Sequence, residues 1–506
     1  MSRIIDILLT DLRFLITNLG KDGGQISPSV YDTAQLLRFW PPQQGVWPVV
    51  DWLLRQQQAD GGWGDPLAPL TRDVPTLASV LALHTYGNRK PTRDAARAGL
   101  AFLRQRMGQW SQPLPDDLPI GVELLLPSLL DEAATLRLEL PREPYATLIS
   151  LGEKRRSLIA RMQPSVGTPA VHSWEGWGTD PDPALLDALG SVGTSPAATA
   201  AWLHAAVGRT DLADACATAQ RYLEQAATAS GECIPGCVPT VWPITEFEQA
   251  FSLYVLLIGG LLDHPGLQDA VQPQIHNLAR ALQPTGLGHN SFFSPDGDDT
   301  AVAVAVLSTT GHQVDLAVLK QFENDDHFCT YPGELQTSLI VTAHAVYALA
   351  LSGEEVARHQ TFLLEHQCPD GRWPPDKWNS SWLYTTLEVV LALKNSGHIE
   401  ALKSSFDAML AYQHADGGWG VGSKSTTTDT AYGIFTLRAL RAYEFEQGIL
   451  EDALWKAHQW LLRNYRPFNV NEYKCWTGKE LYRPYRLDSV FELSAMLALA
   501  LEEGSQ

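Results

Sequence analysis

"QQADGGW" (residues 57–63), "QCPDGRW" (residues 367–373) and "QHADGGW" (residues 413–419) are three copies of one seven-residue unit. Each copy has the form Q-x-x-D-G-x-W and follows a helical apolar pattern such as "WPVVDWLLRQQ". Asp and Gly favour a turn at this place, and the Gln amide and Trp ring can tie the turn to the next helix. Repeated helical hairpins of this kind close into α/α toroids or stack as solenoids. The unit therefore predicts an all-α fold.

A second repeated unit, Asp-Thr-Ala, occurs at residues 32–34, 299–301 and 429–431. An Asp or Thr directly before an apolar run is typical of a helix N-cap, so a helix is expected to begin at Asp299. The run that follows, "AVAVAVL" (residues 301–307), is apolar throughout. Periodicity alone does not separate a buried strand from a buried helix there, but the repeated cap favours a helix.

Composition excludes several classes of function. The chain has 506 residues and a formal charge of −20, without any Lys/Arg-rich run that would suit a nucleic acid. The first 20 residues are apolar but interrupted by Asp6 and Asp11, which predicts an amphipathic helix of the fold rather than a signal peptide. No apolar stretch is long enough to cross a bilayer, and six sparse cysteines suit a reducing cytoplasm. Cys233 and Cys237 are expected to be ordinary thiols rather than zinc ligands.

The stretch "SPDGDDTAVAV" (residues 294–304) places Asp296, Asp298 and Asp299 beside an apolar run. In an extended segment, Asp296 and Asp298 would face one cavity. Like charges this close cannot all ionise in an apolar site, so at least one carboxyl should hold a proton at neutral pH. That arrangement suits a positioned acid which protonates an alkene, and it equally suits a carboxylate site for Mg²⁺. Spacing alone leaves both interpretations open.

"DGDDTA" resembles the Asp-x-Asp-Asp-Thr-Ala motif of class II diterpene cyclases, and the Q-x-x-D-G-x-W units resemble their QW motifs. Further matches include "PIGVELLLPSLLDEA", "VHSWEGW", "GSVGTSPAATAAWL" and "GKELYRPY". The resemblance covers nearly the whole chain and is to bacterial members, which lack a class I domain. It implies two α/α-barrel domains, named β and γ. Residues 1–24 would be the first helix of β, residues 25–237 the inserted γ domain, and residues 238–506 the rest of β with the acid motif.

The resemblance implies protonation-initiated cyclisation of geranylgeranyl diphosphate to a bicyclic labdane-type (copalyl) diphosphate. Asp298 would be the general acid, with Asp296 and Asp299 orienting it. The diphosphate would be retained, and the sequence has no Asp-Asp-x-x-Asp ionisation motif. A separate class I terpene synthase would then use the product.

The resemblance also suggests where the cation loses its proton. In plant relatives of the ent series, a His in Leu-His-Ser and an Asn in Pro-Asn-Val position the base. Here His172 in "VHS" matches the first, while Thr240 in "PTV" replaces the second. Thr has no amide, so the quenching step and the stereochemistry stay open, and a capping or core role is the alternative for His172.

Cations of the family bind the diphosphate, and Lys154 in "GEKRRSL" lies where the family has such a lysine. Lys377 and Lys479 are further candidates, with a structural role as the alternative. Asp116 and Asp117 match the place of a looser acidic motif that is linked to Mg²⁺ in relatives. Mg²⁺ is therefore the expected cofactor.

Other products and functions remain as alternatives. Hydride and methyl shifts before proton loss would give a halimadienyl or clerodane (kolavenyl) diphosphate, and farnesyl diphosphate would give a drimenyl product. Protein prenyltransferase β subunits share the α/α barrel, but they need an Asp, Cys and His zinc site that does not stand out here. A toroid that only binds an isoprenoid is the non-enzyme alternative.

Overall fold

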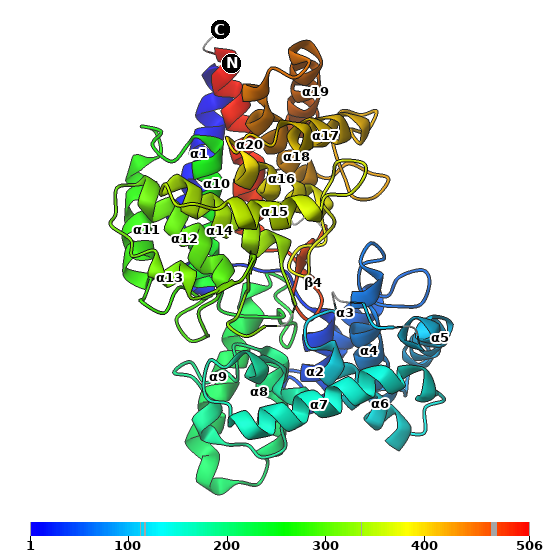
Figure 1. Ribbon diagram of the computed structural model, residues 1–506. Coiled ribbons are helices and arrows are strands. Elements are labelled where there is room, and N and C mark those ends of the chain that lie inside the picture. Colours follow the sequence, from blue (N-terminus) through cyan, green and yellow to red (C-terminus); the bar gives the residue numbers. More distant parts are fainter. Residues whose placement is uncertain (1, 112, 116–117, 335, 467–472, 505–506) are drawn as a thin grey trace.

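The computed structural model describes all residues except 1, 112, 116–117, 335, 467–472 and 505–506. Figure 1 shows two groups of helices joined end to end, with both termini at the far end of one group. Helix α1 belongs to the same group as α10–α20, although α2–α9 of the other group follow it in sequence. The predicted all-α class is confirmed.

The larger group is a closed ring of six inner helices, in which each helix packs on the next and α20 packs on α10. These inner helices are α10 (Thr245–Gly259), α12 (Gly297–Thr309), α14 (Leu339–Leu351), α16 (Trp382–Leu393), α18 (Thr427–Leu440) and α20 (Tyr485–Gly504). The outer layer comprises α1 (Ser2–Thr17), α11 (Gln268–Ala281), α13 (Ala317–Lys320), α15 (Ala357–Glu365), α17 (Ile399–Ala411) and α19 (Gln447–Asn464). Inner helices are buried on nearly all sides, which is why their sequences are apolar all round.

The smaller group repeats this plan with fewer helices. Its inner helices are α2 (Val30–Phe39), α4 (Asp73–Thr85), α6 (Val122–Thr135) and α8 (Pro196–Ala205), and a 3₁₀ segment, Pro169–Gly176, closes the ring between α6 and α8. The outer helices are α3 (Trp47–Arg55), α5 (Lys90–Arg106), α7 (Ala146–Met162) and α9 (Ala213–Ala229).

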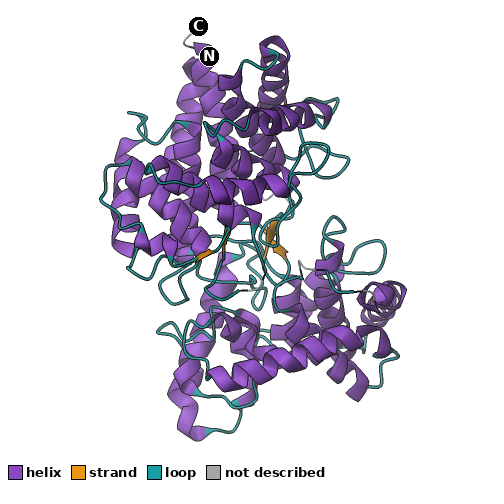
Figure 2. Cartoon of the chain, in the orientation of Figure 1, coloured by secondary structure: helices purple, strands orange, loops and turns teal. Residues whose placement is uncertain are grey.

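Two short antiparallel hairpins lie where the groups of helices meet, as the orange arrows in Figure 2 show. The first pairs β1 (Glu323–Asn324) with β2 (His327–Phe328), and the second pairs β3 (Trp476–Thr477) with β4 (Leu481–Tyr482). Within the described part of the chain, no helix combines the length and apolar character needed to span a membrane.

The three Q-x-x-D-G-x-W units make the same hydrogen bonds in the structure. In the unit at residues 367–373, the Gln367 amide donates to the carbonyl of Gly371 (3.0 Å) and to that of Ala401 (2.9 Å) in the next outer helix. The Trp373 indole donates backward to the Leu363 carbonyl (2.7 Å), and its backbone N–H donates to the next inner helix. The other two units repeat these contacts. Each unit thus ties one helical hairpin to the following one.

The prediction that Asp-Thr-Ala supplies the N-cap was wrong by three residues. The caps of α2, α12 and α18 are Ser29, Asp296 and Thr426, and each accepts from the N–H of the Asp three positions later. A cap side chain reaches the third residue of the helix, so the Asp of each unit lies inside the first turn. The apolar run after Asp299 is helical, as expected.

We expect Trp373→Phe to lower the free energy of unfolding by about 1–3 kcal/mol, because the Leu363 carbonyl loses the indole donor and keeps only the longer bond from the His366 N–H (3.3 Å). Trp455→Phe is the matched control, since the Trp455 side chain is 56% exposed, and it should cost less than about 0.5 kcal/mol. Urea unfolding of both variants measures the difference. Equal effects would contradict the assigned role of the repeat.

Candidate functional site

A cavity lies between the two rings, with walls from both. The larger ring contributes Asp296, Asp298 and Asp299 from the start of α12, and the smaller ring contributes His172 and its neighbours. Its other walls are mainly apolar and aromatic: Ile120, Pro169, Val241, Ile244, Phe247, Phe251, Phe293, Tyr331, Trp378, Trp476 and Tyr482. The predicted acid cluster therefore faces a hydrocarbon-lined space.

Asp298 has a charged partner behind it. The Nδ1 of His344 on α14 donates to Asp298 Oδ1 (2.6 Å), and the His344 Nε2 lies 3.1 Å from Glu388 Oε2 on α16. Burial alone would lower the pKa of His344, but the two carboxylates outweigh it and raise the pKa to about 10. The imidazole is therefore protonated at neutral pH. The Tyr254 hydroxyl completes the group by donating to Glu388 (2.6 Å).

This arrangement makes Asp298 a strong acid toward the cavity in the state in which it carries a proton. When the proton leaves, the remaining carboxylate is stabilised by the His344 imidazolium and by the N-terminus of α12. The Asp298 side chain is 14% exposed, whereas His344 and Glu388 are fully buried. Among these three groups, Asp298 alone lines the cavity and can reach a substrate.

Asp296 and Asp299 form a tight pair beside it. Asp296 Oδ1 accepts from the Asp299 N–H (2.8 Å). Burial raises the pKa of Asp296 to about 7, and burial together with the charge of Asp296 raises the pKa of Asp299 well above its ordinary value. Both shifts favour a cluster that holds a proton at neutral pH. Gly297 is required between them, because a Cβ there would lie 2.3 Å from the Cys329 carbonyl oxygen.

Aromatic rings pack edge to face along one wall of the cavity. Phe247 and Phe251 each contact Trp476 on β3, at centroid distances of 5.3 and 5.7 Å. Phe251 also packs against the ring of His344 at 5.7 Å. Aromatic faces attract a cation by about 0.5–2 kcal/mol each and carry no lone pair that could trap it. The wall therefore suits a reaction that proceeds through carbocations.

The predicted pair for proton loss, His172 and Thr240, also lines the cavity. His172 Nδ1 donates to the Gly193 carbonyl (2.8 Å), and burial lowers the pKa of His172 well below its ordinary value. The Thr240 hydroxyl is buried and has no hydrogen-bond partner among the described residues. A second histidine, His289, lines the same wall. The roles predicted for His172 and Thr240 stay predictions.

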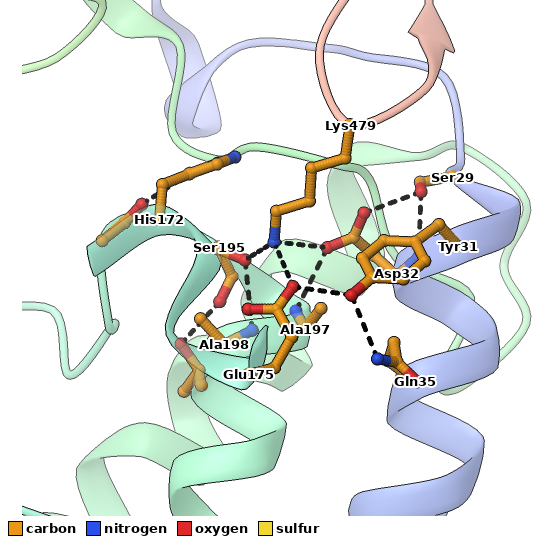
Figure 3. Close-up of polar contacts among 12 residues, drawn as sticks. Ser29, Tyr31, Asp32, Gln35, His172, Glu175, Ser195, Ala197, Ala198 and Lys479 are labelled. Atoms are coloured by element: carbon orange, nitrogen blue, oxygen red, sulfur yellow. Dashed lines mark hydrogen bonds and ion pairs between the residues drawn. The ribbon is translucent and has the colours of Figure 1, made fainter. Parts of the chain in front are cut away.

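Lys479 follows Gly478, which lines the cavity, and lies in a fully buried network that Figure 3 shows. Its Nζ contacts Glu175 Oε1 (2.6 Å) and Ser195 Oγ (2.7 Å), and Asp32 Oδ1 is 3.8 Å away. The Tyr31 hydroxyl donates to the same Glu175 oxygen (2.9 Å). This lysine joins the β3–β4 hairpin to the smaller ring. It has partners for its charge already, and its predicted binding of diphosphate stays a prediction.

The other predicted cations lie apart from each other. Lys377 is buried and pairs with Glu334 Oε1 (2.6 Å), while Lys154 is exposed on α7. Asp116 and Asp117, the predicted Mg²⁺ ligands, lie outside the described residues. Among the residues that the structure does describe, no group of three or more His, Cys, Asp or Glu is arranged to hold a metal.

Known proteins resemble this chain over its whole length. A (+)-kolavenyl diphosphate synthase of Herpetosiphon aurantiacus is 50% identical over 99% of both chains. A copalyl diphosphate synthase of Streptomyces cyslabdanicus is 30% identical over 96% of this chain and 94% of its own. This chain belongs to the class II diterpene cyclases.

Two further comparisons agree with this assignment. The squalene-hopene cyclase C-terminal domain model matches residues 312–441 of the cyclase. The solved ent-copalyl diphosphate synthase from Streptomyces platensis superposes with a TM-score of 0.79 at 28% identity, covering 97% of the cyclase and 99% of that chain. The predicted family and the α/α toroid fold are confirmed.

Sequence reasoning missed His344, Glu388 and His289 as parts of the site. His344 and Glu388 stand in apolar helical runs, "VTAHAVYALA" and "WLYTTLEVVLAL", where a lone ionisable residue is commonly a satisfied core group. The sequence did carry one signal. His344 and Glu388 lie on two successive apolar helices, and both of these helices follow the one with the acid motif. Ionisable groups are rarely fully buried unless they are paired.

We expect His344→Gln to lower kcat by about 10²-fold or more with little change in KM, because the charge that stabilises Asp298 after proton transfer is lost and His344 does not line the cavity. His359→Gln is the matched control: His359 is also a buried histidine with a carboxylate neighbour, Glu323, but on outer helix α15. Steady-state kinetics and melting temperatures of both variants provide the comparison. An unchanged kcat in His344→Gln would contradict the role of His344.

Proposed function

We propose that this cyclase converts geranylgeranyl diphosphate to a clerodane-type, kolavenyl diphosphate. One observation carries the proposal: the 50% identity to a (+)-kolavenyl diphosphate synthase over 99% of both chains, against 30% for a copalyl diphosphate synthase. The motifs alone placed an unrearranged labdane product first. The comparison favours the rearranged product instead.

The reaction would begin at Asp298. Its carboxyl proton adds to the terminal alkene of the substrate, and the electron pairs of the next two alkenes form two ring bonds, leaving a tertiary ring cation. Hydride and methyl groups then migrate with their electron pairs to the cationic carbon. Each migration leaves the positive charge on the carbon that the group left, so the cation moves back through the ring system. Loss of one proton forms the final ring alkene. The diphosphate takes no part in bond making, so the whole change is an isomerisation.

The walls of the cavity support rearrangement before quenching. Phe247, Phe251 and Trp476 line the cavity, and aromatic faces attract a migrating cation. Thr240 replaces the Asn whose amide positions the quenching group in plant relatives of the ent series. Without that amide, early proton loss next to the first ring cation is less favoured. Both features favour a longer cation lifetime.

The test is incubation of the purified enzyme with geranylgeranyl diphosphate and Mg²⁺, followed by dephosphorylation and product identification by mass spectrometry and NMR. We expect kolavenol from the wild type and unchanged substrate from Asp298→Asn, while Asp315→Asn, at an exposed aspartate, should behave as the wild type. Copalol as the main product would restore the labdane alternative. Turnover of farnesyl diphosphate alone would indicate a drimenyl diphosphate synthase. Turnover of neither geranylgeranyl nor farnesyl diphosphate would favour the non-enzyme alternative, a toroid that only binds an isoprenoid.

Mg²⁺ belongs to the same proposal. Mg²⁺ is commonly held by one or two carboxylates together with substrate phosphates, so a bound diphosphate would supply most of the ligands. Asp116 and Asp117 are the proposed protein ligands. We expect EDTA to lower turnover at least tenfold, mainly through KM, and added Mg²⁺ to restore it. Full activity in EDTA would remove the metal from the proposal.

A further inference from the structure

Two histidines from different parts of the chain meet on one wall of the cavity. His172 belongs to the 3₁₀ segment of the smaller ring, and His289 precedes the acid motif. The ring of Phe293 lies between them, 4.6 Å from His289 and 6.0 Å from His172 between centroids. Both imidazoles bind to one short loop, His172 to Gly193 and His289 to Thr194.

The loop fixes which nitrogen of each ring carries the proton. The Gly193 carbonyl can only accept, so His172 must be protonated at Nδ1 (2.8 Å). When the Thr194 hydroxyl donates its single proton to the same carbonyl (2.8 Å), it accepts from His289 Nε2 (3.1 Å). In that arrangement His289 is protonated at Nε2, and its Nδ1 has a free lone pair. No described residue donates to that nitrogen, and His289 lines the cavity.

Thr194, which binds His289, has a strained backbone conformation. Its φ is +54°, which is a genuine outlier for a β-branched residue and costs on the order of 1–3 kcal/mol. The Lys479 network fixes the same loop, because Nζ contacts the Ser195 hydroxyl that also caps α8 (Figure 3). Strain held in place by a buried ion-pair network indicates a functional geometry.

His289 is better placed than its neighbours to accept a proton. Burial lowers the pKa of His289 to about 4, so the ring is neutral and available at neutral pH. Burial lowers the pKa of His172 as well, and there the nearby Lys479 charge adds to the effect of burial in disfavouring the imidazolium. The Asp298 carboxylate is stabilised by His344, which makes it a reluctant base after it has given up its proton. A carbocation acidifies its neighbouring C–H bonds strongly, so a weak neutral base suffices.

We propose that His289 is the catalytic base that ends the reaction and that Thr194 is its positioning residue. The C–H bond next to the final cation breaks, its electron pair forms the ring alkene, and the proton moves to His289 Nδ1. The Phe293 ring, tilted against His289 at a centroid distance of 4.6 Å, then lies close enough to stabilise the imidazolium. This inference rests on the proposed cyclisation and names the group that completes it.

The first test compares products of His289→Phe with those of the wild type. The variant should still consume geranylgeranyl diphosphate within about tenfold of the wild-type rate, because protonation by Asp298 is intact, but the wild-type product should fall at least tenfold in favour of alcohols or alkene isomers. His276→Phe, at an exposed histidine of α11, should give the wild-type product. The wild-type product from His289→Phe at the wild-type rate overturns the proposal. A folded His289→Phe that consumes no substrate overturns it too.

Thr194 provides a second pair of variants that keep the histidine. Thr194→Val retains the shape and the β-branch but loses the hydroxyl that fixes the His289 tautomer, so we expect a mixed product profile. Thr194→Ser keeps the hydroxyl and should restore the single product. Identical profiles for Val and Ser would show that the hydroxyl does not position His289.

A reaction in D₂O separates His289 from Asp298 as the base. In kolavenyl diphosphate, the ring alkene includes the carbon that received the first proton, so a deuteron from Asp298 and a hydrogen of the substrate share that carbon. We expect the deuteron to remain, because His289 removes the substrate's own hydrogen. Its complete loss would assign the step to the Asp298 carboxylate. A wild type that converts no prenyl diphosphate refutes the proposed function itself, which distinguishes that failure from a failure of the base.

Discussion

The ion pairs of His344 are the interaction on which the site depends. Asp298, His344 and Glu388 stand on three successive inner helices, α12, α14 and α16, and meet inside the larger ring. Each charge would be expensive to bury alone, and removing one partner of such a group leaves the others uncompensated. The ion pairs that support Asp298 therefore form only when the ring is closed with its helices in the right order and register.

The repeated turn at residues 367–373 supplies the register between the hairpin of α14 and the hairpin of α16. Each Q-x-x-D-G-x-W unit bonds the turn to its own helix and to the next hairpin, so neighbouring inner helices are set at a fixed height. The cap of α12 differs in chemistry from the caps of its two relatives. Ser29 and Thr426 cap α2 and α18 with hydroxyls, whereas α12 is capped by the carboxylate of Asp296. A structural cap has thus become part of an acid cluster, and the helix keeps its cap.

The sequence predicts the parts of this molecule that repeat. The all-α class and the QW turns follow from three copies of one unit, and Asp298 follows from its motif. The exact cap was mispredicted because Asp, Ser and Thr all cap helices, and hydrogen bonding to the third residue places the cap three positions earlier. His344, Glu388 and His289 could not be assigned, since their roles come from contacts between segments 44 to 95 residues apart. Lys377 and Lys479 show the same limit: the sequence gives no sign of the carboxylates, Glu334 and Glu175, with which they pair.

The protonation state of His344 tests the account most directly. The ¹⁵N resonances of its ring, assigned by comparison with His344→Gln, report whether one or both nitrogens carry a proton. Both carboxylates raise the pKa of this imidazole to about 10, so we predict that both nitrogens stay protonated from pH 7 to pH 9. Replacing one carboxylate, in Glu388→Gln, should bring the loss of the proton to lower pH. A neutral His344 at pH 7 in the wild type would contradict the account, because Asp298 would then lack the charge that stabilises it after it protonates the substrate.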